Sequence, residues 1–508
     1  MDDTTWEWGA ERLGDLPSNQ DSLLLHHALE APAAPPLEQR IFVNRTLRLE
    51  KIAHVGFDLD WTLADYHRNA MSELAFELTL DRLVENGYPK VILESEFRTD
   101  FCRRGLILDT ELGMVLKMNR HRYVGRAYFG RRYLDGTARG DLYRREPINP
   151  SSNRFYHVDT LFELPEVNIF SEVIELANRR PEALSLESYV QLFRDTREAI
   201  DSIHRDGTLK ARILADLPKY LPQDEELILA LRRFALDGRK LLLITNSEWY
   251  YTDALCRHLF EGVVPGLDDW RELFDLVIVS AAKPGFFKKR SPFLRLDDHG
   301  EEVESVHAPQ WGGVYSGGSR EGLMELLDVP GEQVLYLGDH IYGDILSTKL
   351  ASTWRTALVV SELEEELAVT SRMAAQMRHK AVLRAELAEM GFQIDGLRDV
   401  QALNARLRGD SDGADDDAMA ELDAQLKALR RDHKAMRQHA SRLQSRISRA
   451  INPRWGSLFK QGSNKSLFGS QVDDFACLYT SRVRNFARYG SRHYFRVSAD
   501  PMMHEVEL

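Results

Sequence analysis

Acidic, basic and hydroxyl side chains follow short apolar runs of this sequence at spacings that suit phosphoryl transfer. Taken in chain order, the residues after four of these runs are Asp58 and Asp60, then Thr245, Asn246 and Ser247, then Lys283, then Asp339 and Asp344. Two carboxylates spaced i, i+2 leave a strand end on the same side, so Asp58 and Asp60 can face one pocket.

These side chains predict a specific chemistry. Asp58, Asp60 and Asp339 could hold a hard divalent cation, and Mg²⁺ fits because it favours a few carboxylates together with waters and phosphate. The cation and Lys283 would neutralise phosphate oxygens as charge develops. Asp58 could attack phosphorus as a covalent nucleophile, while Asp60 protonates the departing oxygen and later deprotonates water.

Five apolar runs must position these residues, and they are Ile52–Phe57, Leu241–Ile244, Leu276–Val279, Val334–Leu337 and Ala357–Val360. Continuous apolar runs of this length are typical of strands buried on both faces of a parallel sheet. Helical patterns separate the later runs, which indicates an open α/β sheet. Ligands of such sheets bind beyond the carboxyl ends of the strands, where the candidate residues stand.

About 180 residues separate the first two runs, far too many for a simple crossover, so a folded insertion is expected. We expect a polar N-terminal arm (1–40), a catalytic core (41–68 and 236–361), an inserted cap (69–235) and a helical C-terminal region packing on the core (362–508). Leu422, Leu429, Met436 and Leu443 repeat every seven residues, which predicts a helical hairpin or coiled coil. The acidic stretch Gly409–Asp417 lacks the ligand pattern of an EF-hand and is expected to be a loop.

Within the insertion, Leu186–Arg205 reads as an amphipathic helix. Arg197, Asp201 and His204 are spaced i, i+4, i+7 and therefore share one face of it. Gly207 suits the end of this helix, and Lys210 lies just beyond.

Composition narrows the function classes. A net charge of −13 offers no general footprint for nucleic acid, and no apolar run approaches the ~20 residues that span a bilayer. The three cysteines stand far apart, which argues against a zinc site or a disulfide framework. The acidic N-terminus lacks the features of a secretory signal, so a cytoplasmic location is the simplest expectation.

The motifs DxDxT at Asp58, the strand-end Thr245, Lys283 and GDxxxxD at Asp339 together resemble the haloacid dehalogenase (HAD) superfamily of phosphatases. The segments GFDLDWTLADY, ITNSEWYYTDAL, AAKPGFF, VYSGGS and LGDHIYGDIL resemble its cytosolic purine 5′-nucleotidase branch. The inserted Arg197–Lys210 segment and the C-terminal GSLFKQGSNKSLFGSQV resemble that branch too. The resemblance as a whole runs from about residue 41 almost to the end of the sequence.

The resemblance implies a doubly wound parallel sheet with a large inserted cap, a homo-oligomer (dimer or tetramer) and hydrolysis of IMP or GMP, with possible phosphotransfer to nucleosides. It also implies roles for individual residues. Mg²⁺ would be held by Asp58, Asp339 and the backbone carbonyl of Asp60. Asp344 would support these ligands without binding the ion directly. Thr245, Asn246, Ser247, Lys283 and Lys210 would surround the phosphate, and Arg197 and Asp201 would face the nucleoside, with His204 either touching the ribose or serving the structure.

Three stretches depart from the family pattern or lie near the site. Tyr128–Arg132 stands where an aromatic residue beside an asparagine is expected to stack on the base, so Phe129 or Arg131 would have to serve. Lys349-Leu350 replaces a lysine pair, which predicts weak or absent activation by ATP. The glycine-rich stretch Gly312–Ser319 lacks a P-loop ending and is expected to form a turn near the site or a subunit contact.

Two other functions stay open at this stage. The same chemistry could serve another phosphomonoester, such as a sugar phosphate or a pyrimidine nucleotide. Alternatively, the chain could be a non-catalytic nucleotide-binding protein that uses the fold without turnover.

Overall fold

The computed structural model describes residues 34–143, 148–149, 152–407 and 416–497. Most of the expected N-terminal arm and most of the expected loop Gly409–Asp417 lie outside these residues. The chain forms two compact units, one of residues 1–364 with 458–508 and the other of residues 365–457.

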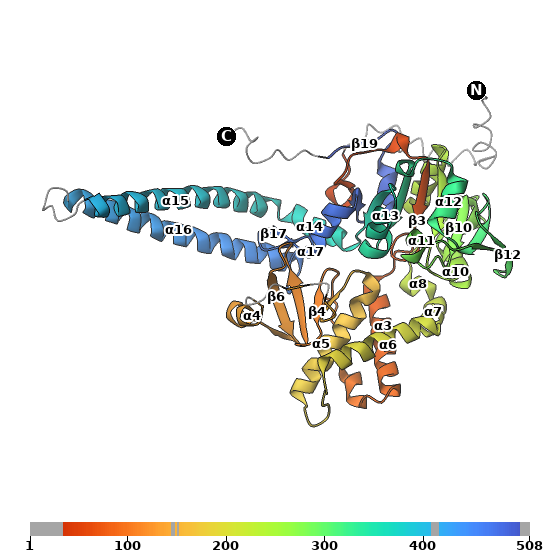
Figure 1. Ribbon diagram of the computed structural model, residues 1–508, viewed down its shortest axis with the longest axis horizontal. Helices are drawn as coiled ribbons and strands as arrows, with labels where there is room; N and C mark the ends of the chain where they lie inside the picture. Colours follow the sequence, from red (N-terminus) through yellow and green to blue (C-terminus); the bar gives the residue numbers. More distant parts are fainter. Residues whose placement is uncertain (1–33, 144–147, 150–151, 408–415, 498–508) are drawn as a thin grey trace. The chain divides into compact units, whose positions relative to one another are not determined.

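A ten-stranded sheet forms the centre of the first unit, in the order β1-β18-β15-β14-β3-β9-β10-β13-β11-β12 (Figure 1). The five predicted strands are its middle: β3 (His54–Phe57), β9 (Lys240–Ile244), β10 (Leu276–Val279), β14 (Val334–Gly338) and β15 (Arg355–Val359). Each is parallel to its neighbours among them, and nearly every residue in them is buried. The prediction of a parallel α/β sheet is confirmed.

Helices link these strands in the way that a parallel sheet requires. Helix α9 (Glu225–Leu236) leads into β9, α10 (Trp249–Phe260) connects β9 to β10, α12 (Arg320–Leu327) leads towards β14, and α13 (Ser347–Ala351) precedes β15. Helix α9 buries Leu227, Ile228, Leu231 and Phe234, and the Phe234 ring lies 6.2 Å from that of Phe57 on β3. This packing anchors the strand that ends at Asp58.

The remaining strands correct one expected boundary. They are β1 (Phe42–Val43), β11 (Phe293–Leu296), β12 (Glu302–Val306), β13 (Val314–Gly317) and β18 (Leu478–Thr480). Strand β18 pairs in parallel with β15, so residues 458–508 belong to the first unit and do not continue a helical region that starts at 362. A buried strand of three residues has too short a pattern to be recognised from the sequence.

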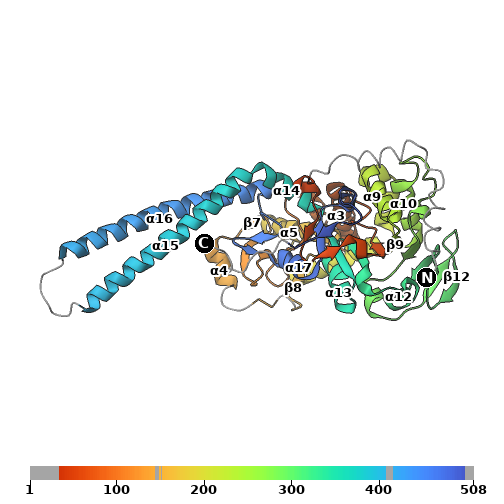
Figure 2. The same cartoon turned by 90° about the horizontal axis from the view of Figure 1, so that it is seen from above.

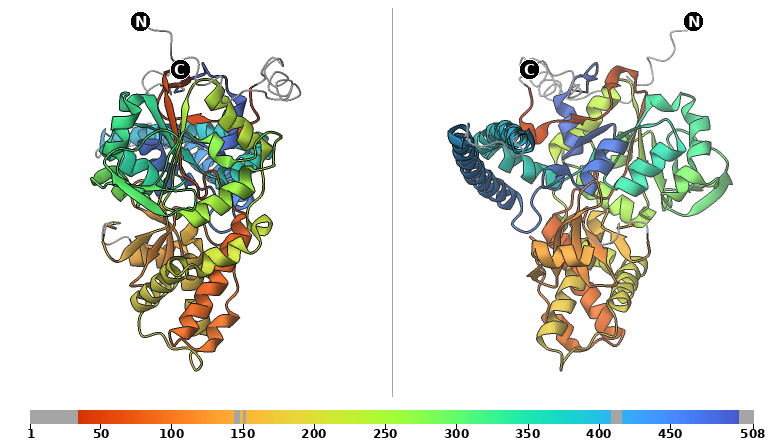
Figure 3. Two further views of the ribbon diagram at one scale, coloured as in Figure 1. Left: turned by 90° about the vertical axis from the view of Figure 1, so that its right-hand side faces the viewer. Right: turned by 60° about the vertical axis from the view of Figure 1, so that its left-hand side comes forward.

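The insertion after β3 is a folded α+β layer (Figure 3). Its five-stranded antiparallel sheet has the order β7-β6-β5-β4-β8, from β4 (Ile107–Asp109), β5 (Met114–Met118), β6 (Val124–Phe129), β7 (Arg132–Tyr133) and β8 (Phe155–His157). Helices α3 (Arg68–Glu85), α5 (Leu164–Arg179), α6 (Tyr189–Arg205) and α7 (Thr208–Leu214) accompany it. Helix α6 is the amphipathic helix expected at Leu186–Arg205, and the Ser188 side chain caps it by accepting from the Gln191 N–H.

The second unit is an antiparallel helical hairpin of α15 (Ala374–Leu407) and α16 (Asp416–Ile451), which lie side by side (Figure 2). Leu383, Ile394, Leu426 and Ile447 are buried between them, and the heptad residues Leu422, Leu429, Met436 and Leu443 are half-buried. The heptad repeat of the sequence thus lies on α16 of a helical hairpin, one of the two arrangements expected from it. No described helix is long and apolar enough to cross a membrane.

The hairpin makes a stability prediction. A Cβ added at Gly396, inside α15, meets no atom within 4 Å, so Gly396→Ala should raise the free energy of unfolding of the hairpin by up to about 1 kcal/mol, because alanine favours the helix. Urea unfolding followed by circular dichroism measures the change. Gly56→Ala on β3 is the contrasting variant and should destabilise, because its Cβ would lie 2.9 Å from the Tyr336 ring. A destabilised Gly396→Ala protein would contradict the hairpin geometry.

Candidate active site

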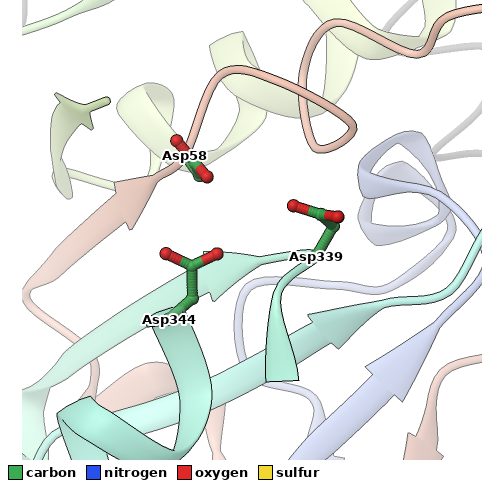
Figure 4. A group of neighbouring side chains, drawn as sticks. All are labelled: Asp58, Asp339 and Asp344. Carbon is green, nitrogen blue, oxygen red and sulfur yellow. The ribbon is translucent and has the colours of Figure 1, made fainter. Parts of the chain in front are cut away.

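The carboxyl ends of β3, β9, β10 and β14 meet at one edge of the sheet, and the residues that follow them converge there. The ammonium group of Lys283 lies 2.8 Å from Asp58 Oδ1 and 2.9 Å from Asp344 Oδ1. It also donates to the Tyr336 hydroxyl at 2.9 Å. Carboxylate oxygens of Asp58, Asp339 and Asp344 lie within 4.8 Å of one another, and Figure 4 shows the three side chains turned toward a common centre.

The charges of this cluster do not balance on their own. Burial raises the pKa of Asp58 to about 7 although Lys283 opposes the shift, and burial also raises the pKa of Asp339 well above its usual range. Burial disfavours the charged form of Lys283, but Asp344 and Asp58 outweigh it and hold the Lys283 pKa well above its usual value. Three carboxylates lie around the Lys283 ammonium, and the Arg104 guanidinium, 3.7 Å from Asp339, is itself shared with Glu362. A further positive charge would therefore stabilise the ionised forms of the three carboxylates.

The donor set fits Mg²⁺. The cluster offers only carboxylate oxygens, which are the hard ligands that Mg²⁺ takes. Asp339 Oδ2 is buried and makes no hydrogen bond with the described residues, as expected of an oxygen that awaits a ligand. Asp344, which was expected to act from behind the ligands, is a member of this group of three.

Asp60 is held apart from this cluster. Its Oδ1 accepts a hydrogen bond of 2.6 Å from the Tyr66 hydroxyl, and its Oδ2 accepts one of 2.7 Å from the Ser247 hydroxyl. The carboxylate predicted as a side-chain metal ligand is thus engaged elsewhere, which leaves the backbone carbonyl named in the resemblance. Two donors instead fix the Asp60 carboxylate beside Asp58, in a position that suits proton transfer.

The segment after β9 positions its neighbours. The Asn246 side chain accepts from the Lys283 N–H at 2.6 Å and donates to the Lys283 carbonyl at 3.0 Å, which ties the loop of Lys283 to β9. Thr245 is fully buried, and its hydroxyl accepts from the Ser247 N–H at 3.1 Å. All three predicted residues therefore lie at the site and, in this structure, hold Lys283 and Asp60.

The insertion brings Lys210 and His204 toward the same place. Lys210 on α7 pairs with Glu248 and lies 5.2 Å from the centre of the Tyr251 ring, whose hydroxyl is 2.9 Å from that of Tyr66. The His204 ring packs edge-on against Phe162 at 5.6 Å, and Phe162 lies 5.9 Å from Trp61, the residue after Asp60. Burial lowers the pKa of His204.

Arg197 on α6 is clamped by residues of the insertion. Its Nη1 contacts the Tyr156 hydroxyl and lies 2.7 Å from Glu166 Oε1, while its Nη2 lies 3.8 Å from Asp201. Glu163 Oε1 is a further 3.5 Å neighbour of Nη1. Arg197 and Asp201 thus share one face of α6, as predicted, but three acidic groups surround the guanidinium.

The residues expected to stack on a base lie elsewhere. Phe129 packs edge-on against Tyr189 at 5.8 Å, and Arg131 is bound by Glu172 at 2.6 Å, so both serve the insertion's own packing. A different aromatic residue of the insertion, Phe162, lies beside Trp61 and His204. Its sequence signal is the capping box Thr160-x-x-Glu163, which fixes the turn that carries it.

Arg104 is a second residue that the sequence analysis missed. It comes from the insertion and is fully buried, donating to the backbone carbonyl of Asp339 at 2.7 Å and to Glu362 through Nε at 3.0 Å. Burial opposes the charge on Glu362, but Arg104 outweighs it and lowers the Glu362 pKa to about 2. No motif marks Arg104, because the fold alone brings it to Asp339.

His340, the glycine-rich stretch and the Lys349-Leu350 pair each make contacts that support the local structure. His340 Nδ1 accepts from the backbone N–H groups of Tyr342 and Gly343, each at 3.2 Å, and so caps the turn that carries Asp344. Gly318 packs directly against the Phe293 ring, which leaves no room for a side chain in the glycine-rich turn. Lys349 donates to the Trp354 carbonyl at 3.1 Å, while Leu350 is exposed. The absence of ATP activation stays a prediction.

Comparison with known proteins gives a family-level match. The profile of the 5′ nucleotidase family matches residues 41–507. The rat protein called 5′-nucleotidase domain-containing protein 2 is 28% identical over an alignment of 508 residues, which covers 96% of this chain and 84% of that protein. The human protein of the same name is 29% identical over 487 residues, which cover 92% of this chain and 85% of its own.

The pair Arg104–Glu362 predicts how stability depends on pH. The Glu362 pKa is about 2 in the folded protein against an ordinary value of 4.5, so the charged Glu362 stabilises the fold fully above about pH 4.5, and this contribution is lost as pH falls from 4.5 toward 2. Glu362→Gln removes the closest carboxylate partner of the buried Arg104 guanidinium and should cost about 3–5 kcal/mol at pH 7. The difference from wild type should narrow over that window, as measured by urea unfolding at several pH values.

Glu302→Gln on the exposed strand β12 is the matched control and should change stability little at any pH. A difference between wild type and Glu362→Gln that stays constant down to pH 2 would contradict the assignment.

Proposed function

The chain belongs to the 5′ nucleotidase family, and we propose that it is a Mg²⁺-dependent 5′-nucleotidase that hydrolyses IMP or GMP to nucleoside and phosphate. One observation carries the proposal: Asp58, Asp339, Asp344 and Lys283 form one buried cluster at the carboxyl edge of the sheet, with Asp60 held separately beside it. The proposal keeps the cytoplasmic location and the homo-oligomer expected from the sequence.

The reaction proceeds in two displacements on phosphorus. A carboxylate oxygen of Asp58 bonds to phosphorus as the ester P–O bond breaks, and Asp60 donates its proton to the departing 5′ oxygen. Asp60 then takes a proton from a water molecule, whose oxygen attacks the aspartyl-phosphate and releases phosphate with Asp58 restored. A nucleoside 5′-hydroxyl in place of that water would give phosphotransfer.

The residues around phosphorus divide the remaining work. Asp58 and Asp339, with Asp344 beside them, would hold Mg²⁺, which supplies positive charge to the phosphate oxygens when bound. Lys283 adds a fixed charge on the same side, and it stays protonated because Asp344 and Asp58 flank it. Tyr66 and Ser247 keep the Asp60 carboxylate in place through both proton transfers.

The nucleoside would lie toward α6. Glu166 and Tyr156 hold Nη1 of Arg197, and the other guanidinium nitrogens would donate to O6 and N7 of a 6-oxopurine. The half-exposed Asp201 carboxylate could accept the N1–H, and Phe162 supplies an aromatic face between Trp61 and His204. Thr245, Asn246, Ser247 and Lys210 complete the phosphate side.

A second candidate rests on Glu163. Its carboxylate lies 3.5 Å from Arg197 and competes with the base for the guanidinium. Such competition would favour another phosphomonoester, a sugar phosphate or a pyrimidine nucleotide, with the same Asp58 chemistry. The third possibility, a nucleotide-binding protein without turnover, requires no phosphate release from any monophosphate.

Replacing the nucleophile tests the mechanism. Asp58→Asn should reduce Mg²⁺-dependent phosphate release from IMP by at least about 10³-fold, because no carboxylate remains to form the intermediate. Asp60→Asn should reduce it by roughly 10²–10⁴-fold through loss of proton transfer. Both are measured with Mg²⁺ and with EDTA, and Glu302→Gln serves as the control. An Asp58→Asn enzyme within tenfold of wild type would disprove the nucleophile assignment.

Replacing Arg197 tests the substrate. Arg197→Ala should lower kcat/KM for IMP and GMP by roughly 10–100-fold, because a bidentate contact to the base contributes about 1–3 kcal/mol. Turnover of ribose 5-phosphate should change little. Arg205→Ala, an exposed arginine on the same helix, is the matched control. Equal losses for all substrates would mean that Arg197 supports the insertion's structure and does not read the base.

A further inference from the structure

The outer face of α16 carries an unusual concentration of positive charge for a chain with a net charge of −13. Between residues 427 and 449 it has eight basic residues and one acidic residue, Asp432. The basic residues are all exposed, and they are Lys427, Arg430, Arg431, Lys434, Arg437, Arg442, Arg446 and Arg449. Leu426 and Ile447 of the same helix are buried, and at 3.6 residues per turn the eight exposed basic residues cover about half of the helix surface, which is called its outer face here.

The partner helix shows that the hairpin does not need this pattern. Between its first and last residues, α15 carries five basic and four acidic residues, and three of the basic ones precede three of the acidic ones. A mixture of both signs is usual on the outer surface of a helical hairpin, because it supports solubility without self-repulsion. The acidic residues of α16 other than Asp432 all stand before residue 427, so its excess of positive charge is confined to 427–449, and helix packing does not require it.

These charges also have few acidic neighbours. Arg431 pairs with the adjacent Asp432 at 3.1 Å. Among the residues that the structure describes, no carboxylate forms an ion pair with Lys427, Arg430, Lys434, Arg437, Arg442 or Arg446. In the sheet-containing unit, by contrast, many arginines have such a partner, for example Arg82, Arg104 and Arg154. Uncompensated like charges repel one another, and an anionic partner would relieve that repulsion.

The chemistry of the face selects among anionic partners. Helix α16 has no Phe, Tyr or Trp, which argues against stacking on single-stranded bases. None of the exposed large apolar residues of the described chain lies on it, which argues against insertion into a membrane and against an apolar protein interface. Six of the eight basic residues are arginines, whose forked guanidinium groups match phosphate oxygens.

We propose that the outer face of α16, from Lys427 to Arg449, is a docking surface for the phosphate backbone of double-helical nucleic acid. The face is about 33 Å long, close to one turn of a duplex, and it presents charge without groups that read bases. Binding is thus electrostatic, independent of sequence and strongly reduced by salt. The surface belongs to the second unit and the residues of the proposed phosphatase site belong to the first, so the proposal does not depend on the proposed enzymatic function.

The test is fluorescence anisotropy of the full chain with a labelled duplex of roughly 20 base pairs, from about 50 to 200 mM salt. The variant R430Q/K434Q/R437Q removes three charges spaced i, i+4, i+7 on one face of α16. We expect its affinity to fall at least about tenfold and the slope of log K against log salt to become shallower by about 2–3. The control R378Q/R398Q/R406Q removes the same charge from α15 and should bind nearly as wild type.

Three results would overturn the proposal. One is the absence of duplex binding by the wild-type chain up to roughly 100 μM protein at the lowest salt. Another is an equal loss in the two triple variants, which would mean that net charge alone acts. The third is binding to phosphatidylserine vesicles without binding to a duplex, which would identify a membrane surface instead. Far-UV circular dichroism establishes that each variant keeps its helices.

Discussion

The contact of Lys283 with Asp58 and Asp344 is the interaction on which the rest of the site depends. The Lys283 ammonium lies among three carboxylates, and the nearby Arg104 guanidinium also serves Glu362, so the charges at this edge of the sheet are compensated only in part. The surroundings hold these groups in place: Asn246 secures the Lys283 backbone from β9, and His340 caps the turn that carries Asp344. These contacts hold the charged groups in fixed positions, where they would attract a cation and a phosphate group.

A second buried charge pair joins the insertion to the sheet. The guanidinium of Arg104, a residue of the insertion, donates hydrogen bonds to the backbone carbonyl of Asp339 and to the Glu362 carboxylate. A buried ion pair of this kind adds little net stability over apolar packing, but breaking it is costly because one charge is then left uncompensated. The insertion is therefore tied to the backbone of a residue at the catalytic edge, and its position and that of Asp339 are interdependent.

The two units of the chain carry different charge patterns. In the unit that contains the sheet, many exposed and half-buried arginines pair with carboxylates, as Arg82, Arg271 and Arg484 do. On α16, over residues 427–449, the ion pair between Arg431 and Asp432 accompanies eight basic residues. The net charge of the whole chain conceals this difference, which is why the expectation of no nucleic-acid partner does not extend to every surface of the protein.

The sequence by itself determined the five central strands, the order of the residues at their ends, the amphipathic helix α6 and the hairpin. Each depends on local periodicity or on a motif that follows a strand, and both can be read without knowing what lies across the fold. Only the tertiary structure decided that Asp344 joins Asp58 and Asp339, that Tyr66 and Ser247 hold Asp60, and that Phe162 and Arg104 reach the site in place of Phe129 and Arg131. These contacts join residues that are far apart along the chain or that depend on side-chain orientation, so no local pattern records them. The same holds for β18, whose three residues form a strand only because β15 lies beside them.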